Sequence, residues 1–159
     1  ELRQVEGMGE NAAVFLKLVP AAYSYARQSS CPDRIVSSVE EAGAYFQKLL
    51  SGKKQELLYQ MCLDGKGKVL SCRCISQGST EAAAVSTRQV VSDALRAGAS
   101  AVLLAHNHPS GIALPSEQDT AVTKLLRQAL QSVDVTLIDH LIVADEDYVS
   151  LRQSGLMSF

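Results

Sequence analysis

The fold is decided by the stretch AVLLAHNHPSGIALPSEQD, which occupies residues 101–119. Its first five residues form a short, continuous apolar run, which is typical of a strand that is buried on both faces. His106 and His108 follow the run, and the prolines and glycine after them predict a loop. A helix is then expected from about residue 116 to residue 131. This order predicts an α/β fold with two histidines just past the carboxyl end of a central strand.

The segments around this stretch continue the alternation of strands and helices. Ser38 and Glu41 are spaced as a capping box for a helix that ends before Gly52. The pair Asp64-Gly65 between two apolar runs predicts a hairpin. The remaining predicted elements are strands at 56–63 and 69–76, a helix at 87–97, and strands at 135–143 and 148–150. Together they predict a mixed β-sheet that is flanked by helices.

Composition and charge describe an ordinary globular protein. The chain has 159 residues, a net charge of -2 and 47% hydrophobic residues, which gives no general attraction to nucleic acid or to an anionic membrane. No apolar run is long enough to span a membrane, and the first residues lack the layout of a signal peptide. We therefore expect a cytoplasmic protein without a membrane partner. Its four cysteines are expected to be free thiols: Cys31, Cys62, Cys72 and Cys74.

Residues 1–34 are predicted to be a short helical appendage and a linker ahead of the main domain at residues 35–159. A Gly-x-Gly turn at residues 7–9 precedes a helical stretch that Pro20 should kink or split. The segment 29–33, which contains two serines and a proline, then indicates the linker.

His106, His108 and Asp119 form a candidate metal site. Residues two apart in extended backbone point to the same side, so both imidazoles can reach one ion. Asp119 lies in the first turn of the following helix, where a carboxylate is favoured and can point back toward the strand end. Two imidazoles and one carboxylate leave zinc a fourth position for water, which is typical of catalytic rather than structural zinc sites.

Each of these residues also has an explanation that needs no metal. The pattern His-x-His is a weak signal that is common by chance. Ser116 and Asp119 are three residues apart, which is the spacing of a helix-capping box. The metal hypothesis therefore depends on the conjunction of all three residues after a buried strand and ahead of a turn and a helix.

The spacing from His106 to Asp119, with Ser116 between them, resembles the JAMM motif of the MPN metallopeptidase superfamily. The longer string HNHPSG at residues 106–111 resembles the RadC branch of that superfamily, and the resemblance covers the predicted main domain. It implies a cytidine-deaminase-like fold and hydrolysis of amide bonds. It also implies one zinc ion per chain, held by His106, His108 and Asp119.

The same resemblance implies two catalytic residues. The family's glutamate corresponds to Glu56 in the first strand, where it would act as general base toward the zinc-bound water. The family's serine corresponds to Ser116, whose hydroxyl would stabilise the oxyanion. Without the resemblance, Glu56 would be interpreted as a solvated charge and Ser116 as a helix N-cap. His140 is interpreted as a packed histidine or as a group that orients a ligand, and it stays outside the predicted site.

Three classes of function follow. The leading hypothesis is a zinc metallopeptidase that acts on a peptide or isopeptide bond of a protein substrate. The second is a DNA-associated repair or accessory protein, as the historical DNA-repair name of RadC proteins suggests, or a metal-dependent nuclease, because zinc-activated water can also attack phosphate. Residues 1–34 resemble half of the helix-hairpin-helix of RadC proteins, and this incomplete hairpin and the acidic pI argue against strong DNA binding by this chain alone. The third is a catalytically silent interaction module. The sequence departs from the family pattern in the loop at residues 112–114, which is apolar where the family prefers an acidic residue and proline. The sequence predicts no oligomeric state.

Overall fold

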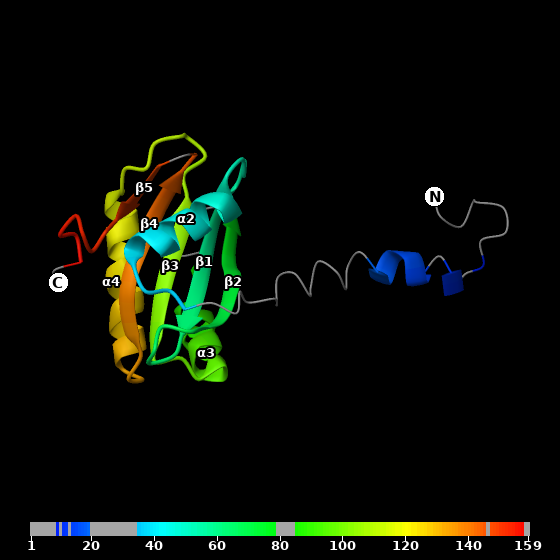
Figure 1. The fold of residues 1–159 in the computed structure, drawn as a ribbon, viewed down its shortest axis with the longest axis horizontal. Helices are drawn as coiled ribbons and strands as arrows, with labels where there is room; N and C mark the ends of the chain where they lie inside the picture. Colours follow the sequence, from blue (N-terminus) through cyan, green and yellow to red (C-terminus); the bar gives the residue numbers. More distant parts are fainter. Residues whose placement is uncertain are drawn as a thin grey trace.

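The computed structural model describes residue 9 and residues 11–12, 14–19, 35–78, 85–145 and 147–157. From residue 35 onward, the helices and strands are, in chain order (Figure 1), α2 (Val39–Leu50), β1 (Glu56–Leu63), β2 (Val69–Gly78), α3 (Thr87–Ala97), β3 (Ala101–Asn107), α4 (Glu117–Gln131), β4 (Thr136–Ala144) and β5 (Asp147–Ser150). The predicted order of elements is confirmed.

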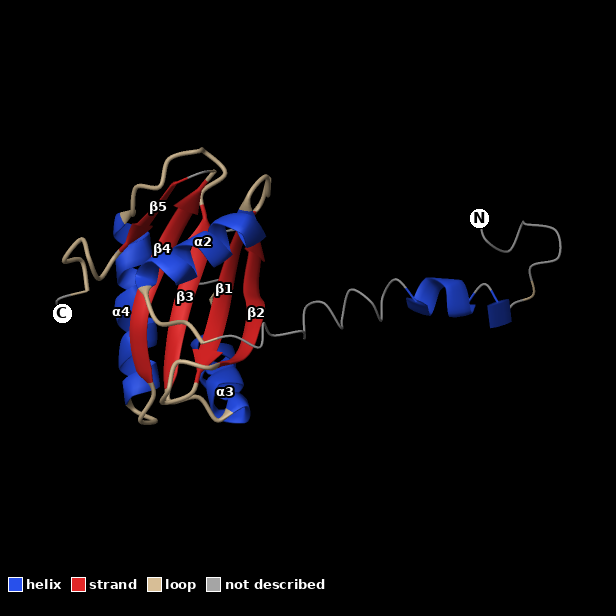
Figure 2. Ribbon diagram, viewed as in Figure 1, coloured by secondary structure: helices blue, strands red, loops and turns tan. Residues whose placement is uncertain are grey.

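The five strands form one mixed sheet in the order β2-β1-β3-β4-β5. Strand β1 is antiparallel to β2 and to β3, β3 is parallel to β4, and β4 is antiparallel to β5. Because parallel neighbours need a crossover connection, the chain leaves β3 through a loop, returns along α4 and then enters β4 (Figure 2). The predicted mixed sheet is confirmed, and the carboxyl ends of β3 and β4 lie side by side.

Helices cover both faces of the sheet. Apolar residues of α3 and α4 pack against one face, and those of α2 pack against the other. Strand β3 contributes to both cores: Val102 and Leu104 face α3 and α4, whereas Leu103 and Ala105 face α2. The apolar run is therefore buried on both faces, as its composition predicts.

Strand β3 is longer than the apolar run indicates. It extends to Asn107, because His106 is paired with Leu58 of β1 and with Ile142 of β4. The prediction that both histidines follow the strand is therefore wrong for His106, which belongs to the sheet. Only His108 lies beyond the strand end.

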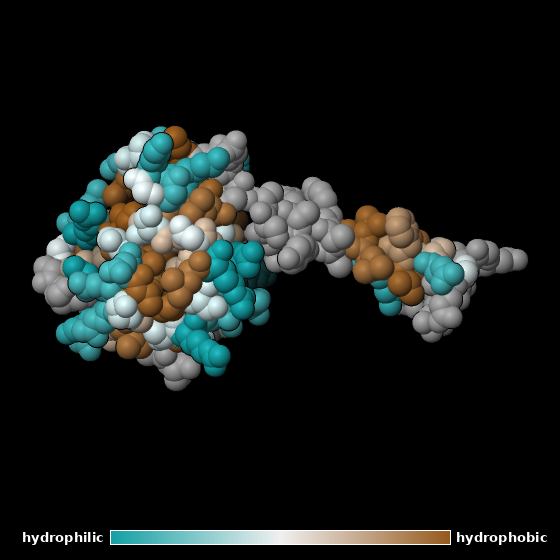
Figure 3. Space-filling model, turned by 90° about the horizontal axis from the view of Figure 1, so that it is seen from below, coloured by the Kyte–Doolittle hydropathy of each residue, from teal (hydrophilic) through white to brown (hydrophobic). Residues whose placement is uncertain are grey.

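Within residues 1–34, the structure describes only residue 9 and the helical residues 11–12 and 14–19. The large apolar side chains of residues 14–19 are exposed: Val14, Phe15, Leu16, Leu18 and Val19. The helix that carries them is largely brown, that is hydrophobic, in Figure 3. The predicted linker and the kink at Pro20 lie outside the described residues.

The described cysteines contribute no disulfide. Cys62 and Cys72 are buried free thiols, and Cys74 is an exposed one, whereas Cys31 lies outside the described residues. Among the helices that the structure describes, none is both long and apolar enough to cross a membrane.

Candidate metal centre

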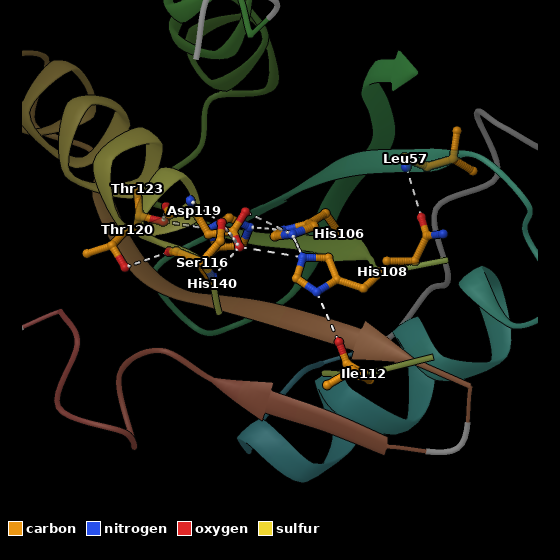
Figure 4. Close-up of polar contacts among 10 residues, drawn as sticks. Leu57, His106, His108, Ile112, Ser116, Asp119, Thr120, Thr123 and His140 are labelled. Atoms are coloured by element: carbon orange, nitrogen blue, oxygen red, sulfur yellow. Dashed lines mark hydrogen bonds and ion pairs between the residues drawn. The ribbon is translucent and has the colours of Figure 1, made fainter. Parts of the chain in front are cut away.

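His106 and His108 project from the carboxyl end of β3 toward the start of α4 (Figure 4). Their Nε2 atoms lie 2.9 Å apart. The His106 side chain is buried within the sheet, whereas that of His108 remains 15% exposed beyond the strand end. The alternation of side chains along extended backbone thus brings both imidazoles to one point, as the spacing predicts.

Asp119, in the first turn of α4, approaches the same point. Its Oδ1 lies 3.1 Å from Nε2 of His106, and its Oδ2 lies 3.5 Å from Nε2 of His108. Asp119 also completes a capping box, because its Oδ2 accepts from the N–H of Ser116 at 2.7 Å and its own N–H donates to Ser116 Oγ at 3.1 Å. The Ser116 hydroxyl donates to Oδ2 as well, at 2.6 Å. The capping and metal-site explanations are therefore compatible: the cap fixes the carboxylate that faces the imidazoles.

The chemistry of the converging atoms fits a metal ion. One potential ligand atom from each of the three residues lies within 4.8 Å of the others. Nδ1 of His108 lies 3.0 Å from the carbonyl oxygen of Ile112, and since a carbonyl only accepts, Nδ1 bears the proton and donates it. The Nε2 atom of a neutral His108 therefore presents a lone pair. Lone pairs and a carboxylate that converge repel one another without a cation, so these residues could hold a metal ion.

The electrostatics of the site favour a charged Asp119 beside a cation. Burial by itself would raise the pKa of Asp119. The hydrogen bonds that His106 and His108 can donate when their Nε2 atoms carry a proton outweigh it and hold the pKa well below its ordinary value. The hydrogen bond with Asp119 in turn raises the pKa of His108, against the opposing effect of burial. A proton on His108 and a metal ion are thus alternative ways to neutralise the same carboxylate.

Glu56, the first residue of β1, lies on the face of the sheet that contains this cluster. Side chains alternate along a strand, so Glu56 points to the same face as Leu58. Leu58 lines a small cavity together with His106 and Asp119. The negative charge of Glu56 also contributes to the raised pKa of His108, so the two side chains are within electrostatic reach. Glu56 therefore lies on the same face of the sheet as the candidate metal centre, and its charge acts on His108.

Known proteins with similar sequences share this domain. A family model described as a RadC-like JAB domain matches residues 36–156. A UPF0758 protein of Pseudoalteromonas translucida is 37% identical over 153 residues, which cover 96% of this chain and 68% of that protein. A UPF0758 protein of Vibrio parahaemolyticus is 33% identical over 156 residues, which cover 98% of this chain and 70% of that protein. The chain belongs to the RadC family.

In this RadC-like JAB domain, Asn107 is a residue of interest that the sequence did not single out. Its Oδ1 accepts a hydrogen bond from the N–H of Leu57 at 2.8 Å. Its Nδ2 donates to the carbonyl oxygens of Gln55 at 2.9 Å and Lys53 at 3.3 Å. Because Leu57 and Gln55 flank Glu56, this amide fixes the backbone of the candidate base. Its place between the two histidines is the one sequence signal that points to it.

His140 of β4 is a second residue outside the predicted site that contacts it. Its Nε2 lies 2.9 Å from Nδ1 of His106, and its Nδ1 lies 2.6 Å from Oγ1 of Thr123. Burial lowers the pKa of His140 well below the ordinary value. His140 therefore touches a candidate ligand as a neutral ring, and it lies behind the converging atoms rather than among them.

The loop between β3 and α4 exposes two apolar side chains beside the site. Ile112 and Leu114 are 63% and 71% exposed. The carbonyl oxygen of Ile112 accepts the hydrogen bond from His108, so this loop lies at the candidate metal centre. An apolar surface therefore borders the site, in line with the composition of residues 112–114.

Proposed function

We propose that this RadC-like JAB domain is a zinc-dependent hydrolase that cleaves a peptide or isopeptide bond. The strongest support is the convergence of His106, His108 and Asp119, whose potential ligand atoms lie within 4.8 Å of one another. Glu56 on the same face of the sheet supplies a carboxylate suited to proton transfer. Metal ligands and a nearby acid–base group are the parts that a metallohydrolase requires.

Zinc suits this set of donors better than magnesium or calcium. Those cations prefer shells of oxygen ligands, whereas zinc is commonly bound by imidazole and carboxylate groups. Three protein ligands leave one position of a tetrahedral zinc site open, as in catalytic zinc sites. When bound, zinc would supply Lewis acidity, which makes a water molecule a stronger acid and a substrate carbonyl a better electrophile.

Glu56 acts as the general base in this proposal. Its carboxylate accepts a proton from the attacking water and later donates that proton to the nitrogen of the leaving amine. The side-chain amide of Asn107 holds the backbone on both sides of Glu56. Proton transfer therefore starts from a fixed position, which lowers the entropic part of the barrier.

Ser116 has a proposed role at the oxyanion. Its hydroxyl donates to Oδ2 of Asp119, so the hydroxyl must rotate before it can donate to substrate. After that rotation, Oδ2 keeps the hydrogen bond from the Ser116 N–H. The helix cap also survives, since Ser116 Oγ accepts from the N–H of Asp119 without using its own proton. The capping and oxyanion roles of Ser116 are therefore compatible.

Metal analysis of protein purified without a histidine tag, followed by assays on a panel of peptides and isopeptides, tests the proposal. We expect one zinc ion per chain and hydrolysis that a chelator abolishes and added zinc restores. Glu56→Gln is the matched variant: it should bind zinc normally and lose about 10²- to 10⁴-fold in hydrolysis rate. A wild-type protein that takes up no added zinc, or equal hydrolysis by the wild type and Glu56→Gln, would contradict the proposal.

Duplex DNA belongs in the same panel, because a zinc-activated water can attack phosphate as well as carbonyl groups. DNA cleavage that a chelator stops, without cleavage of any peptide, would show that the substrate bond is a phosphodiester rather than a peptide bond. Tight zinc binding without hydrolysis of any substrate in the panel would instead favour an interaction module.

A further inference from the structure

A chain of hydrogen bonds runs from the candidate ligand His106 into the core (Figure 4). Nδ1 of His106 lies 2.9 Å from Nε2 of His140, and Nδ1 of His140 lies 2.6 Å from Oγ1 of Thr123. The Thr123 hydroxyl donates to the backbone carbonyl of Asp119 at 2.5 Å, one helical turn earlier. These four residues are at most 2% exposed, so water does not compete for the partners.

The last bond of this chain sets the direction of all the others. The carbonyl oxygen of Asp119 can only accept, so it takes the single hydroxyl proton of Thr123. Thr123 Oγ1 must then accept from His140, which places the His140 proton on Nδ1. A neutral His140 has no second proton, so its Nε2 accepts the Nδ1 proton of His106. Nε2 of His106 is left with a lone pair that faces Asp119.

The surroundings of His140 match this direction of the hydrogen bonds. The ring is fully buried, and its two nitrogens face a hydroxyl and an imidazole rather than a carboxylate. Each ring nitrogen of His140 thus has a single partner, a hydroxyl oxygen at Nδ1 and an imidazole nitrogen at Nε2. The backbone is fixed as well, because the N–H of His140 donates to Oδ1 of Asp139 while the Ser150 hydroxyl donates to Oδ2. The acceptor for His106 is therefore held in place.

We propose that Thr123 and His140 are positioning residues that hold His106 in the Nδ1-protonated tautomer and thereby prepare its Nε2 to bind metal. The opposite tautomer would direct an N–H at the position of the ion. His140 accepts the Nδ1 proton of His106 only while Thr123 Oγ1 accepts the Nδ1 proton of His140. Thr123 therefore acts on His106 through His140. The inference rests on the metal centre of the proposed function but not on hydrolysis.

The first experiment measures the dissociation constant for Zn²⁺ by competition with a chromophoric chelator. Thr123→Val removes the hydroxyl at nearly constant volume, and we expect it to weaken Zn²⁺ binding about 10- to 100-fold. Thr123→Ser keeps the hydroxyl and should bind Zn²⁺ nearly as the wild type does. Leu130→Ala, a fully buried change in the same helix, controls for lost stability and should leave the affinity unchanged.

Three results of this experiment would overturn the proposal. They are an unchanged affinity in Thr123→Val, an equal loss in Thr123→Ser, and an equal loss in Leu130→Ala. Circular dichroism of each variant establishes that the folded state is being compared.

The second experiment records long-range ¹H–¹⁵N correlations of the imidazoles in the metal-free protein at alkaline pH. We expect Nδ1-protonated His106 in the wild type and in Thr123→Ser, and a mixture of tautomers in Thr123→Val. A wild-type His106 that is protonated on Nε2 would overturn the proposal, even where Thr123→Val fails to fold. This measurement needs neither zinc nor substrate, so its outcome is independent of whether the domain is a hydrolase.

Discussion

Two buried carboxylates, Asp119 and Asp139, show how the surroundings of a candidate metal ligand differ from those of a structural acid in the same fold. Both side chains are at most 2% exposed. The oxygens of Asp139 accept from donors on both sides: Oδ1 from the N–H groups of His140 and Arg152, and Oδ2 from the Ser150 hydroxyl. These bonds tie β4 to the turn that follows β5, so Asp139 has a structural role.

In Asp119, only one of the two carboxylate oxygens accepts hydrogen bonds of this kind. The N–H and the hydroxyl of Ser116 donate to Oδ2, whereas Oδ1 faces Nε2 of His106 at 3.1 Å. In the neutral tautomers inferred for His106 and His108, both Nε2 atoms present lone pairs, so this side of Asp119 has no donor unless a proton or a metal ion lies between the carboxylate and the rings. Burial therefore does not identify a functional carboxylate in this domain, whereas the donor or acceptor character of its neighbours does.

Exchange of each acid for its amide should produce opposite results, and this is the largest effect that we expect. A change in a residue that only contacts a ligand is expected to weaken Zn²⁺ binding about 10- to 100-fold. Asp119→Asn changes a proposed ligand itself, so its loss of affinity should be larger. Asp139→Asn should keep Zn²⁺ binding, because the amide oxygen can still accept from the N–H of His140. It should lower the free energy of unfolding by about 1–3 kcal/mol, because an amide cannot accept all three hydrogen bonds. Calorimetric titration and urea unfolding measure the two effects. A folded Asp139→Asn protein that loses zinc as completely as Asp119→Asn would end the distinction.

The pH dependence of Zn²⁺ binding should also separate the two acids. Asp119 raises the pKa of His108 in the metal-free protein, so below that raised pKa the ion must displace a proton. Affinity should then fall about tenfold per pH unit as the pH decreases, and it should level off above the raised pKa. Chelator competition across the pH range measures this curve, and Asp139→Asn should leave it unchanged. An inflection below the ordinary pKa of histidine would contradict the role of Asp119.

The His108–Asp119 pair has a related effect on the stability of the metal-free protein. Because the folded-state pKa of His108 is raised, its contribution is fully present below the ordinary histidine pKa and is lost as the pH rises through the raised value. Urea unfolding at several pH values should show this loss in the wild type. Asp119→Asn should remove most of it.

A smaller effect is expected from Asn107→Ala, which removes the amide that binds the backbone around Glu56. The variant leaves the N–H of Leu57 and the carbonyl oxygens of Gln55 and Lys53 without their partner. We expect the free energy of unfolding to fall by about 1–3 kcal/mol, with Zn²⁺ affinity retained. Hydrolysis, where detected, should change in the same direction as in Glu56→Gln. A loss of Zn²⁺ affinity as large as that of Asp119→Asn would show that Asn107 acts on the ligands instead.

The smallest effect is expected at the exposed apolar loop. Ile112→Ser and Leu114→Ser should change the free energy of unfolding by no more than about 0.5 kcal/mol, because both side chains are largely exposed. Thermal unfolding measures this change. A substantially larger loss would show that these side chains are packed in solution.

Local signals in the sequence predicted most of the fold. The spacing of Ser38 and Ser116 alone predicts them as helix starts, and both side chains accept from a backbone N–H as N-caps should. The end of β3 was not predictable in this way. Its length is set by the pairing of His106 with β1 and β4, and those partners are distant in the sequence.

The same limit applies to the candidate site. His106, His108 and Asp119 were found because they lie within one short stretch of chain. Glu56 was singled out only through the family resemblance, since its approach to the cluster depends on the register between β1 and β3. The contact between His140 and His106 joins residues 34 positions apart, and no local sequence pattern predicts it.

A crystal structure of zinc-loaded protein, purified without a histidine tag and measured at the zinc absorption edge, tests the metal centre most directly. We predict one anomalous peak per chain, at about 2.0–2.2 Å from Nε2 of His106, Nε2 of His108 and a carboxylate oxygen of Asp119. The fourth position should open toward Glu56. No anomalous peak at these residues, or a zinc ion bound elsewhere on the chain, would contradict the account.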